Sequence, residues 1–163
     1  MTIIRPIKKS DNADVAEMIR AVFDEYNATK EGTVYTDPTT DQLFELFNKK
    51  EAIFFIAEIN GNIVGSCGIY PTSGLPIGHG ELVKFYVAES VRGTGIGRQL
   101  YEQSEAFALT SGYQSLYIES MPDFSDAVKL YEKIGYQRLD TPLGQSGHFG
   151  CDIWMLKVLR ENP

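Results

Sequence analysis

The stretch Val87-Ala88-Glu89-Ser90-Val91-Arg92-Gly93-Thr94-Gly95-Ile96-Gly97 decides the fold, because three alternate glycines join an apolar run to a helix-like segment. The apolar run 81–87 predicts a strand, and residues 96–109 predict a helix. Glycine has no Cβ, so its backbone can come close to a ligand. The first N–H groups of a helix have no internal partner and lie at the positive end of its dipole. The stretch therefore predicts a cradle for a phosphate or a pyrophosphate.

Two common nucleotide-binding motifs do not fit this loop. A P-loop needs Lys and then Ser or Thr after its last glycine, where this chain has Arg98 and Gln99. The dinucleotide fingerprint needs a glycine at position 98 and opens a parallel βαβ unit, whereas the preceding strands are expected to be antiparallel. The loop alone leaves open a glycine-rich turn that binds nothing.

Composition indicates a soluble globular protein that forms one domain over residues 1–163. Hydrophobic residues make up 43% of the chain and charged residues 23%. The net charge of -7 disfavours nucleic acid or an anionic membrane as a partner. With no apolar run long enough for a membrane span and no N-terminal signal, a cytoplasmic location is expected.

The pattern of apolar residues predicts an α/β fold with a mixed, mostly antiparallel sheet of about seven strands and helices on both faces. The expected strands are 2–6, 52–57, 63–70, 81–87, 115–119, one from Tyr136 to Leu139, and 153–159. One helix begins at Ser10 or Asp11, with Val15, Met18, Ile19, Val22 and Phe23 toward the core, and a shorter one holds Leu43, Phe44, Leu46 and Phe47. A third turns Ile96, Leu100, Phe107 and Leu109 inward, and a fourth begins at Asp123 or Ser125, turns Ala127, Leu130, Tyr131 and Ile134 inward and ends at Gly135. Strands 81–87 and 115–119 flank a helix, so they are expected to pair in parallel.

Two motifs carry a resemblance to a known family. Arg92-x-x-Gly95-x-Gly97 matches the Gln/Arg-x-x-Gly-x-Gly/Ala loop of the GNAT superfamily of N-acetyltransferases, and Ala127-x-x-Leu130-Tyr131-x-Lys133-x-Gly135-Tyr136 resembles that family's A-x-x-L-Y-x-K-x-G-F ending. The resemblance covers essentially the whole chain and implies acetyl-CoA as co-substrate. One position departs from the family: Phe124 stands where many members have an asparagine that contacts the cofactor.

The resemblance also implies where acetyl-CoA binds. Main-chain groups of Phe85, Tyr86 and Val87 are expected along the pantetheine arm. The pyrophosphate is expected against N–H groups of the glycine loop, with Arg92 or Arg98 adding charge. The residues of this loop are Arg92, Gly93, Thr94, Gly95, Ile96, Gly97 and Arg98.

The implied reaction is direct transfer of acetyl to a primary amine of a small molecule or peptide. An ammonium cannot attack, so a base must take its proton. Glu81 is the first candidate, because it opens the strand that leads into the glycine loop, eleven residues before Arg92, the spacing of the catalytic glutamate in branches of the family. A water-facing glutamate at a strand start is the alternative reading. Glu119 is the second candidate and His79 the third.

Tyr131 is the candidate acid that protonates the leaving thiolate, because it occupies the family's tyrosine position. By sequence alone it could equally be a core aromatic beside Leu130.

The loop 144–152 brings His148, Cys151 and Asp152 within five residues. Their spacing matches no standard zinc pattern, so no metal site is expected. A Cys–His nucleophile would imply a two-step acyl transfer. We interpret the loop as facing the acceptor, with His148, Asp152 and Glu119 on the substrate side; a plain hairpin loop is the alternative.

The sequence leaves two other functions open: a non-catalytic acyl-CoA sensor module, and a nucleotide-binding protein. The expected partner is a small-molecule or peptide amine, with neither nucleic acid nor membrane, and a homodimer is left open. The sequence does not distinguish an amino acid, a polyamine, a drug, a peptide or a protein amine as acceptor.

Overall fold

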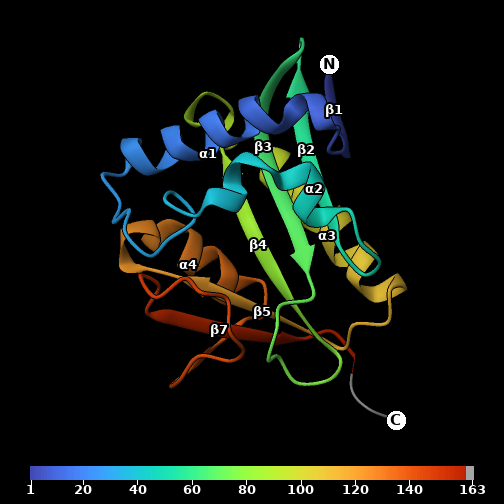
Figure 1. The fold of residues 1–163 in the computed structure, drawn as a ribbon, viewed down its shortest axis with the longest axis vertical. Helices are drawn as coiled ribbons and strands as arrows, with labels where there is room; N and C mark the ends of the chain where they lie inside the picture. The colour runs from blue at the N-terminus through green and yellow to red at the C-terminus, as the bar shows by residue number, and fades with distance from the viewer. Residues whose placement is uncertain (161–163) are drawn as a thin grey trace.

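The computed structural model describes residues 1–160 and contains a seven-stranded mixed sheet (Figure 1). The strand order is β1-β2-β3-β4-β5-β7-β6, and only β4 and β5 pair in parallel. The strands are β1 Thr2–Pro6, β2 Ile53–Ile59, β3 Asn62–Tyr70, β4 His79–Val87, β5 Ser115–Ser120, β6 Gln137–Leu139 and β7 Ile153–Val158. The predicted fold class, element order and parallel pair are confirmed.

Four α-helices cover the sheet: α1 Asn12–Glu25, α2 Leu43–Phe47, α3 Ile96–Thr110 and α4 Ser125–Lys133. Short 3₁₀ turns lie at Lys9–Asp11, Pro38–Asp41, Glu89–Val91 and Pro122–Phe124. The buried side chains of α1 and α2 belong to one hydrophobic cluster, and those of α3 belong to a second, which also takes in Val128 and Tyr131 of α4. Each cluster packs helices against one face of the central strands. None of the helices in residues 1–160 has the length and apolar character needed to cross a membrane.

The predicted inward face of α1 is confirmed, since all five of its expected core residues are buried. Two other details of the helices are wrong. In α3 the fully buried positions follow a spacing of four, Ile96, Leu100, Ser104 and Ala108. Phe107 is partly buried and packs against the core cluster as expected, whereas Leu109 is partly buried and is not among the residues packed against it.

In α4 the buried positions are Val128 and Tyr131, while Leu130 is 43% exposed. The expected caps are also absent, because α4 follows Phe124 and makes no side-chain cap bond. The Asp123 carboxylate instead accepts a hydrogen bond from the Thr29 N–H at 2.7 Å.

Strands β4 and β5 separate soon after they meet. Their parallel pairing runs from His79 opposite Ser115 to Glu81 opposite Tyr117. Figure 1 shows β4 and β5 then diverging at a steep angle. Beyond Glu81, β4 is paired with β3 alone among the described strands, so its other edge is open toward the gap.

A β-bulge lies in β4 beside this gap. Gly68 of β3 faces Val83 and Ser66 faces Tyr86, so one residue of β3 lies opposite both Lys84 and Phe85. Lys84 has a φ of 52°, the left-handed conformation that favours glycine. The buried Ser66 hydroxyl donates to the Lys84 carbonyl at 2.7 Å and holds the bulge in place.

Candidate active site

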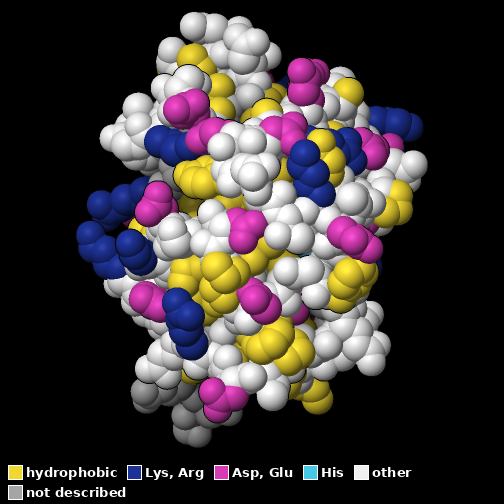
Figure 2. Space-filling model, turned by 90° about the vertical axis from the view of Figure 1, so that its left-hand side faces the viewer, with side chains coloured by type: hydrophobic (Ala, Val, Ile, Leu, Met, Phe, Trp, Pro, Cys, Tyr) yellow, Lys and Arg dark blue, Asp and Glu magenta, His cyan; other side chains and the backbone are white. Residues whose placement is uncertain are grey.

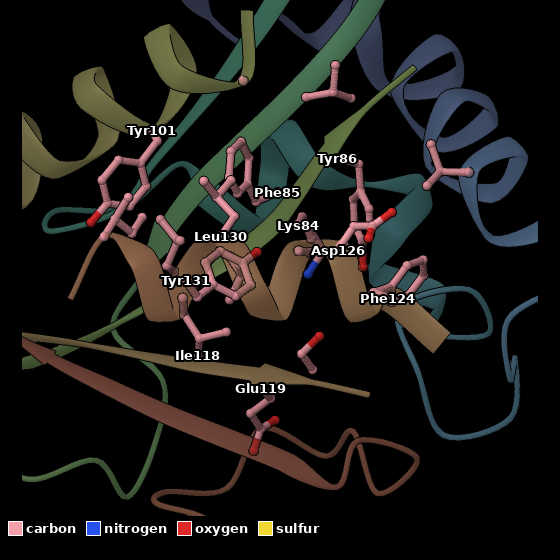
Figure 3. Close-up of a pocket in the computed structure, with 18 of the residues that line it drawn as sticks. Lys84, Phe85, Tyr86, Tyr101, Ile118, Glu119, Phe124, Asp126, Leu130 and Tyr131 are labelled. Atoms are coloured by element: carbon pink, nitrogen blue, oxygen red, sulfur yellow. The ribbon is translucent and has the colours of Figure 1, made fainter. Parts of the chain in front are cut away.

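A cavity of about 760 Å³ lies in the gap between β4 and β5 (Figure 3). Its walls come from β4, the glycine loop, α3, α4 and the loop that precedes β7. It brings together most residues predicted for the site: Glu81, Phe85, Tyr86, Val87, Arg92, Gly93, Gly95, Gly97, Arg98, Glu119, Tyr131 and His148. Thr94, Ile96 and Asp152 are not among its lining residues.

The glycine loop forms one end of the cavity and has the backbone geometry that a phosphate cradle needs. Gly93 and Gly95 have φ angles of 76° and 91°, which disfavour any residue with a side chain. A Cβ at either position would meet no atom within 4 Å, so the backbone conformation and not crowding requires glycine there. Gly95 is the N-cap of α3 and provides no side-chain cap, which leaves the first helical N–H groups for a ligand. These features fit the pyrophosphate of coenzyme A.

The two predicted arginines are engaged with protein partners. The Arg92 guanidinium forms a bidentate pair with Glu25 of α1, and its Nε donates to the Val87 carbonyl at 3.1 Å. Arg98 is exposed and bonds Glu102 one helical turn away at 2.7 Å. Arg92 therefore fixes the loop against α1, while its charge still lies at the cavity wall.

Three lysines also line the cavity: Lys133, which belongs to the second sequence motif, and Lys84 and Lys157, which the sequence did not indicate. Lys157 pairs with Glu105 at 2.7 Å. On the face drawn in Figure 2, acidic and basic side chains are interspersed, with hydrophobic side chains between them. Positive charge for an anionic cofactor is thus supplied by individual side chains around the cavity.

Glu81 lies where the β4–β5 pairing ends, and its side chain is only 3% exposed. It is buried, in contrast to the water-facing alternative. Burial raises the pKa of its carboxyl from about 4.5 to about 7; the Thr72 hydroxyl, which donates to Oε2, opposes this, and the nearby charge of Glu119 adds to it. The carboxyl is therefore poised to exchange a proton near neutral pH.

Glu119 of β5 also lines the cavity, and Figure 3 shows its carboxylate on the side of β5 away from Lys84 and Tyr131. Its Oε2 accepts from the Tyr117 hydroxyl at 2.8 Å, and its Oε1 accepts from the Ser146 hydroxyl. His79 is not a lining residue, and its Nδ1 lies 3.3 Å from the Ile77 carbonyl. The two glutamates are thus brought together and His79 is not.

Tyr131 points its hydroxyl into the cavity from α4 (Figure 3). Its ring packs between Phe85 and Tyr136, with centroid distances of 6.2 and 5.7 Å, so it is also part of the aromatic core. Burial raises the pKa of its hydroxyl well above the usual value, and the group stays protonated at neutral pH.

The loop 144–152 contributes His148 and Cys151 to the cavity, whereas Asp152 is exposed. His148 Nε2 lies 2.8 Å from Asp37 Oδ2, a contact across 111 residues. Burial and nearby carboxylates raise the pKa of the Cys151 thiol to about 12, the opposite of what a thiolate nucleophile needs. Among residues 1–160 no three His, Cys, Asp or Glu side chains gather in a way that could hold a metal ion.

Phe124, the departure from the family pattern, is a packing residue. Its ring contacts Phe23, Tyr26 and Tyr86, with centroid distances of 5.1, 5.5 and 6.0 Å. Phe124 thereby links α1 to β4. It gives the cavity an apolar side chain where many family members have the amide of an asparagine.

Comparison with known proteins agrees with this geometry. Residues 19–136 match the model of the Acetyltransferase (GNAT) family. The chain belongs to this family. It is 31% identical over 158 residues to the uncharacterized N-acetyltransferase YjgM of Escherichia coli K12, a match that covers 96% of this chain and 95% of that protein.

Solved structures show the same fold. A GNAT-family acetyltransferase from Staphylococcus aureus Mu50 superposes with a TM-score of 0.82 at 19% identity, covering 98% of this chain and all of that one. PaiA N-acetyltransferase from Thermoplasma acidophilum, in complex with coenzyme A, gives 0.75 at 17% identity, covering 97% of this chain and 99% of that one. The chain is thus a GNAT acyltransferase with acetyl-CoA as its co-substrate, as the two sequence motifs predicted.

Proposed function

We propose that this enzyme moves the acetyl group of acetyl-CoA to a primary amine of a small molecule or peptide by direct attack, with Glu81 as general base and Tyr131 as general acid. The observation that carries the proposal is the Glu81 carboxyl, which lines the cavity where the β4–β5 pairing ends, is buried, and has its pKa raised to about 7. A base is most effective when its pKa lies near the operating pH. The pKa of Glu81 meets this condition in the conformation that the structure shows.

Acetyl-CoA supplies the acetyl group as a reactive thioester. The open edge of β4 offers the main-chain groups of Phe85, Tyr86 and Val87 to the pantetheine arm, because β4 beyond Glu81 is not paired with β5. The glycine loop and the start of α3 then face the pyrophosphate. This placement would direct the thioester toward Glu81 and Tyr131.

Glu81 takes a proton from the acceptor's ammonium, which frees the nitrogen lone pair. The Thr72 hydroxyl, which donates to Oε2, keeps the carboxyl oriented. Glu119 stays the alternative base, but both of its oxygens already accept hydroxyl hydrogen bonds. We therefore assign Glu119 to the acceptor side, with His148, and expect the exposed Asp152 to contribute least.

Tyr131 donates a proton to the departing thiolate. A thiol has a pKa of about 8.5, so its anion is a moderate leaving group that gains from a donor near neutral pH. The raised pKa of the Tyr131 hydroxyl keeps it protonated at neutral pH, so that it can donate a hydrogen bond to the developing thiolate.

A thiol-release assay with acetyl-CoA and a panel of amines tests the proposal. The panel contains amino acids, polyamines, aminoglycosides and peptide amino termini, and mass spectrometry identifies the acetylated product. We expect thiol release that depends on the amine, together with a mass increase of one acetyl group on nitrogen. Tight binding of acetyl-CoA by calorimetry, with no acetylated product from any amine, would favour the sensor module instead.

A further inference from the structure

Lys84 is a buried cation at the acceptor end of the cavity. Its side chain is 7% exposed and lines the cavity, and Figure 3 shows its nitrogen pointing into the open space. Burial lowers the pKa of the ammonium, while the charges of Asp37 and Glu81 act in the opposite direction. Among residues 1–160 these carboxylates act on Lys84 through space only, because its Nζ makes no hydrogen bond or ion pair with them.

The bulge in β4 places Lys84 there. In a regular strand, residues three apart point to opposite faces, so Glu81 and Lys84 would be separated. The extra residue of the bulge breaks this alternation, and both side chains line the same cavity. The Ser66 hydroxyl, bonded to the Lys84 carbonyl, fixes this arrangement.

The carboxylates around Lys84 are already engaged elsewhere. Asp37 Oδ1 accepts from the N–H and the hydroxyl of Thr39 at 2.9 and 2.7 Å, and its Oδ2 contacts His148. Glu81 accepts from Thr72. The Lys84 Nζ lies 5.9 Å from the centre of the Phe47 ring, a cation–π contact that uses none of its N–H donors. The ammonium can therefore present these donors to a ligand in the cavity.

We propose that Lys84 binds a carboxylate of the acceptor, so that the acceptor is a small amine that also carries a carboxylate, of the α-amino acid class. This inference rests on the proposed role of Glu81 as base. Glu81 and Lys84 are close enough for each charge to act on the other's ionisation. A zwitterion places its ammonium at Glu81 and its carboxylate at Lys84. A polyamine or an aminoglycoside would bring further positive charge toward Lys84, which is repulsive.

The test uses pairs of acceptors that differ only in the carboxylate, phenylalanine with phenethylamine and leucine with 3-methylbutylamine. Each is assayed with the wild type, with Lys84→Met and with Lys84→Gly. Methionine keeps much of the side-chain volume, and glycine suits the positive φ, so the two variants strain the backbone differently but lose the same charge. Lys129→Met, an exposed position of α4 outside the cavity, is the matched control.

For both Lys84 variants we expect KM for the amino acids to rise about ten- to a hundredfold, the usual loss when a hydrogen bond to a charged group is removed. KM for the amines that lack a carboxylate should stay the same or fall, and acetyl-CoA affinity should not change. The amines of the two members of a pair differ in pKa. For each acceptor we therefore compare KM of the variant with KM of the wild type, and the pKa difference cancels in that ratio. Lys129→Met should behave as wild type.

Equal losses of kcat for both members of a pair, with unchanged KM, would overturn the inference and place Lys84 against the acetyl carbonyl. A wild-type enzyme that favours amines without a carboxylate would overturn it as well. Calorimetry with the amino acids in the presence of coenzyme A separates this inference from the proposed reaction. Carboxylate-dependent binding that Lys84→Met abolishes, in an enzyme that acetylates none of the amines, would uphold Lys84 and refute the reaction; absence of such binding would refute the role of Lys84.

Discussion

The two ends of the cavity are built in different ways. The cofactor end is one continuous segment, residues 87–98, in which glycine conformations and helix N–H groups form the surface, and its arginines are held by Glu25 and Glu102. The acceptor end is assembled from ionisable side chains that lie far apart in the sequence: the buried Glu81 and Lys84 and the partly buried Glu119 and His148 line it, and Asp37 contacts His148. Backbone binding suits a co-substrate common to a whole family, while the proposed function assigns the choice of acceptor to side-chain charges.

The largest effect should come from breaking the backbone surface of the cofactor end. Gly95→Asp would place a side chain at a φ of 91° and a negative charge beside the pyrophosphate. Two like charges about 4 Å apart repel by about 4 kcal/mol near a protein surface, so acetyl-CoA affinity should fall by more than about a hundredfold. Calorimetry with acetyl-CoA measures this directly.

Gly112→Asp is the matched control for that variant. Gly112 lies just after the other end of α3, with a φ of 88° and open space where a Cβ would lie, and it does not line the cavity. The two substitutions should strain the backbone alike, but only the first should weaken acetyl-CoA binding. Equal affinity losses in both would mean that the glycines act through stability alone.

The next largest effect concerns the base at the acceptor end. Glu81→Gln should lower turnover about 10²-fold or more while acetyl-CoA affinity stays unchanged, because a positioned base is lost but the cofactor surface is intact. In the wild type, kcat/KM should rise with pH through about 7, where the Glu81 carboxyl loses its proton. The deficit of the variant should shrink at high pH, where more of the amine is already free.

Glu119→Gln distinguishes the two candidate bases. The charge of Glu119 raises the pKa of Glu81, so its removal should move the rise in kcat/KM to lower pH without abolishing turnover. If Glu119→Gln gives the large loss and Glu81→Gln does not, the assignment of the base is wrong.

The same contrast explains what the sequence could predict of the fold. All seven strands and the crossover between β4 and β5 follow from local apolar patterns and are present. The missed details depend on tertiary contacts. Asp123 binds the Thr29 N–H instead of capping α4, and Leu130 lines the cavity and is 43% exposed.

For the site, the glycine loop could be predicted because its function depends on consecutive residues. Lys84 gave only one local signal, a charge inside the apolar run 82–87. The bulge that turns it into the cavity depends on Ser66, eighteen residues earlier, and on the register with β3. Asp37 meets His148 across 111 residues. No periodicity encodes such long-range contacts.

A smaller kinetic effect is expected where the two ends meet, at Tyr131. Tyr131→Phe keeps the ring and its packing but removes the hydroxyl, and single-turnover rates should fall about tenfold with little change in acetyl-CoA affinity. The loss should be smaller than for Glu81→Gln, because a thiolate can leave without full protonation. Tyr136→Phe is the control, since Tyr136 is equally buried and contacts Tyr131 but does not line the cavity. Wild-type single-turnover rates in Tyr131→Phe would make it a core aromatic only.

The smallest expected effect is a pH-dependent change in the free energy of unfolding. It arises at the acceptor end, where burial raises the pKa of the Glu81 carboxyl. The Glu81 carboxyl ionises at about 4.5 when unfolded and at about 7 when folded. Between these values the folded state holds one proton more than the unfolded state, so the free energy of unfolding falls as pH rises through this window. The full penalty, up to about 3 kcal/mol, is present above it. Glutamine has no such penalty, so Glu81→Gln should be more stable than wild type at pH 8 and differ little at pH 5. At about 2–4 °C per kcal/mol, the Tm difference at pH 8 should be several degrees.

Glu17→Gln, on the exposed face of α1, is the control and should change Tm little at either pH. A Tm difference for Glu81→Gln that is the same at both pH values would show that burial does not hold the Glu81 proton, and the acceptor end would then lack its poised base.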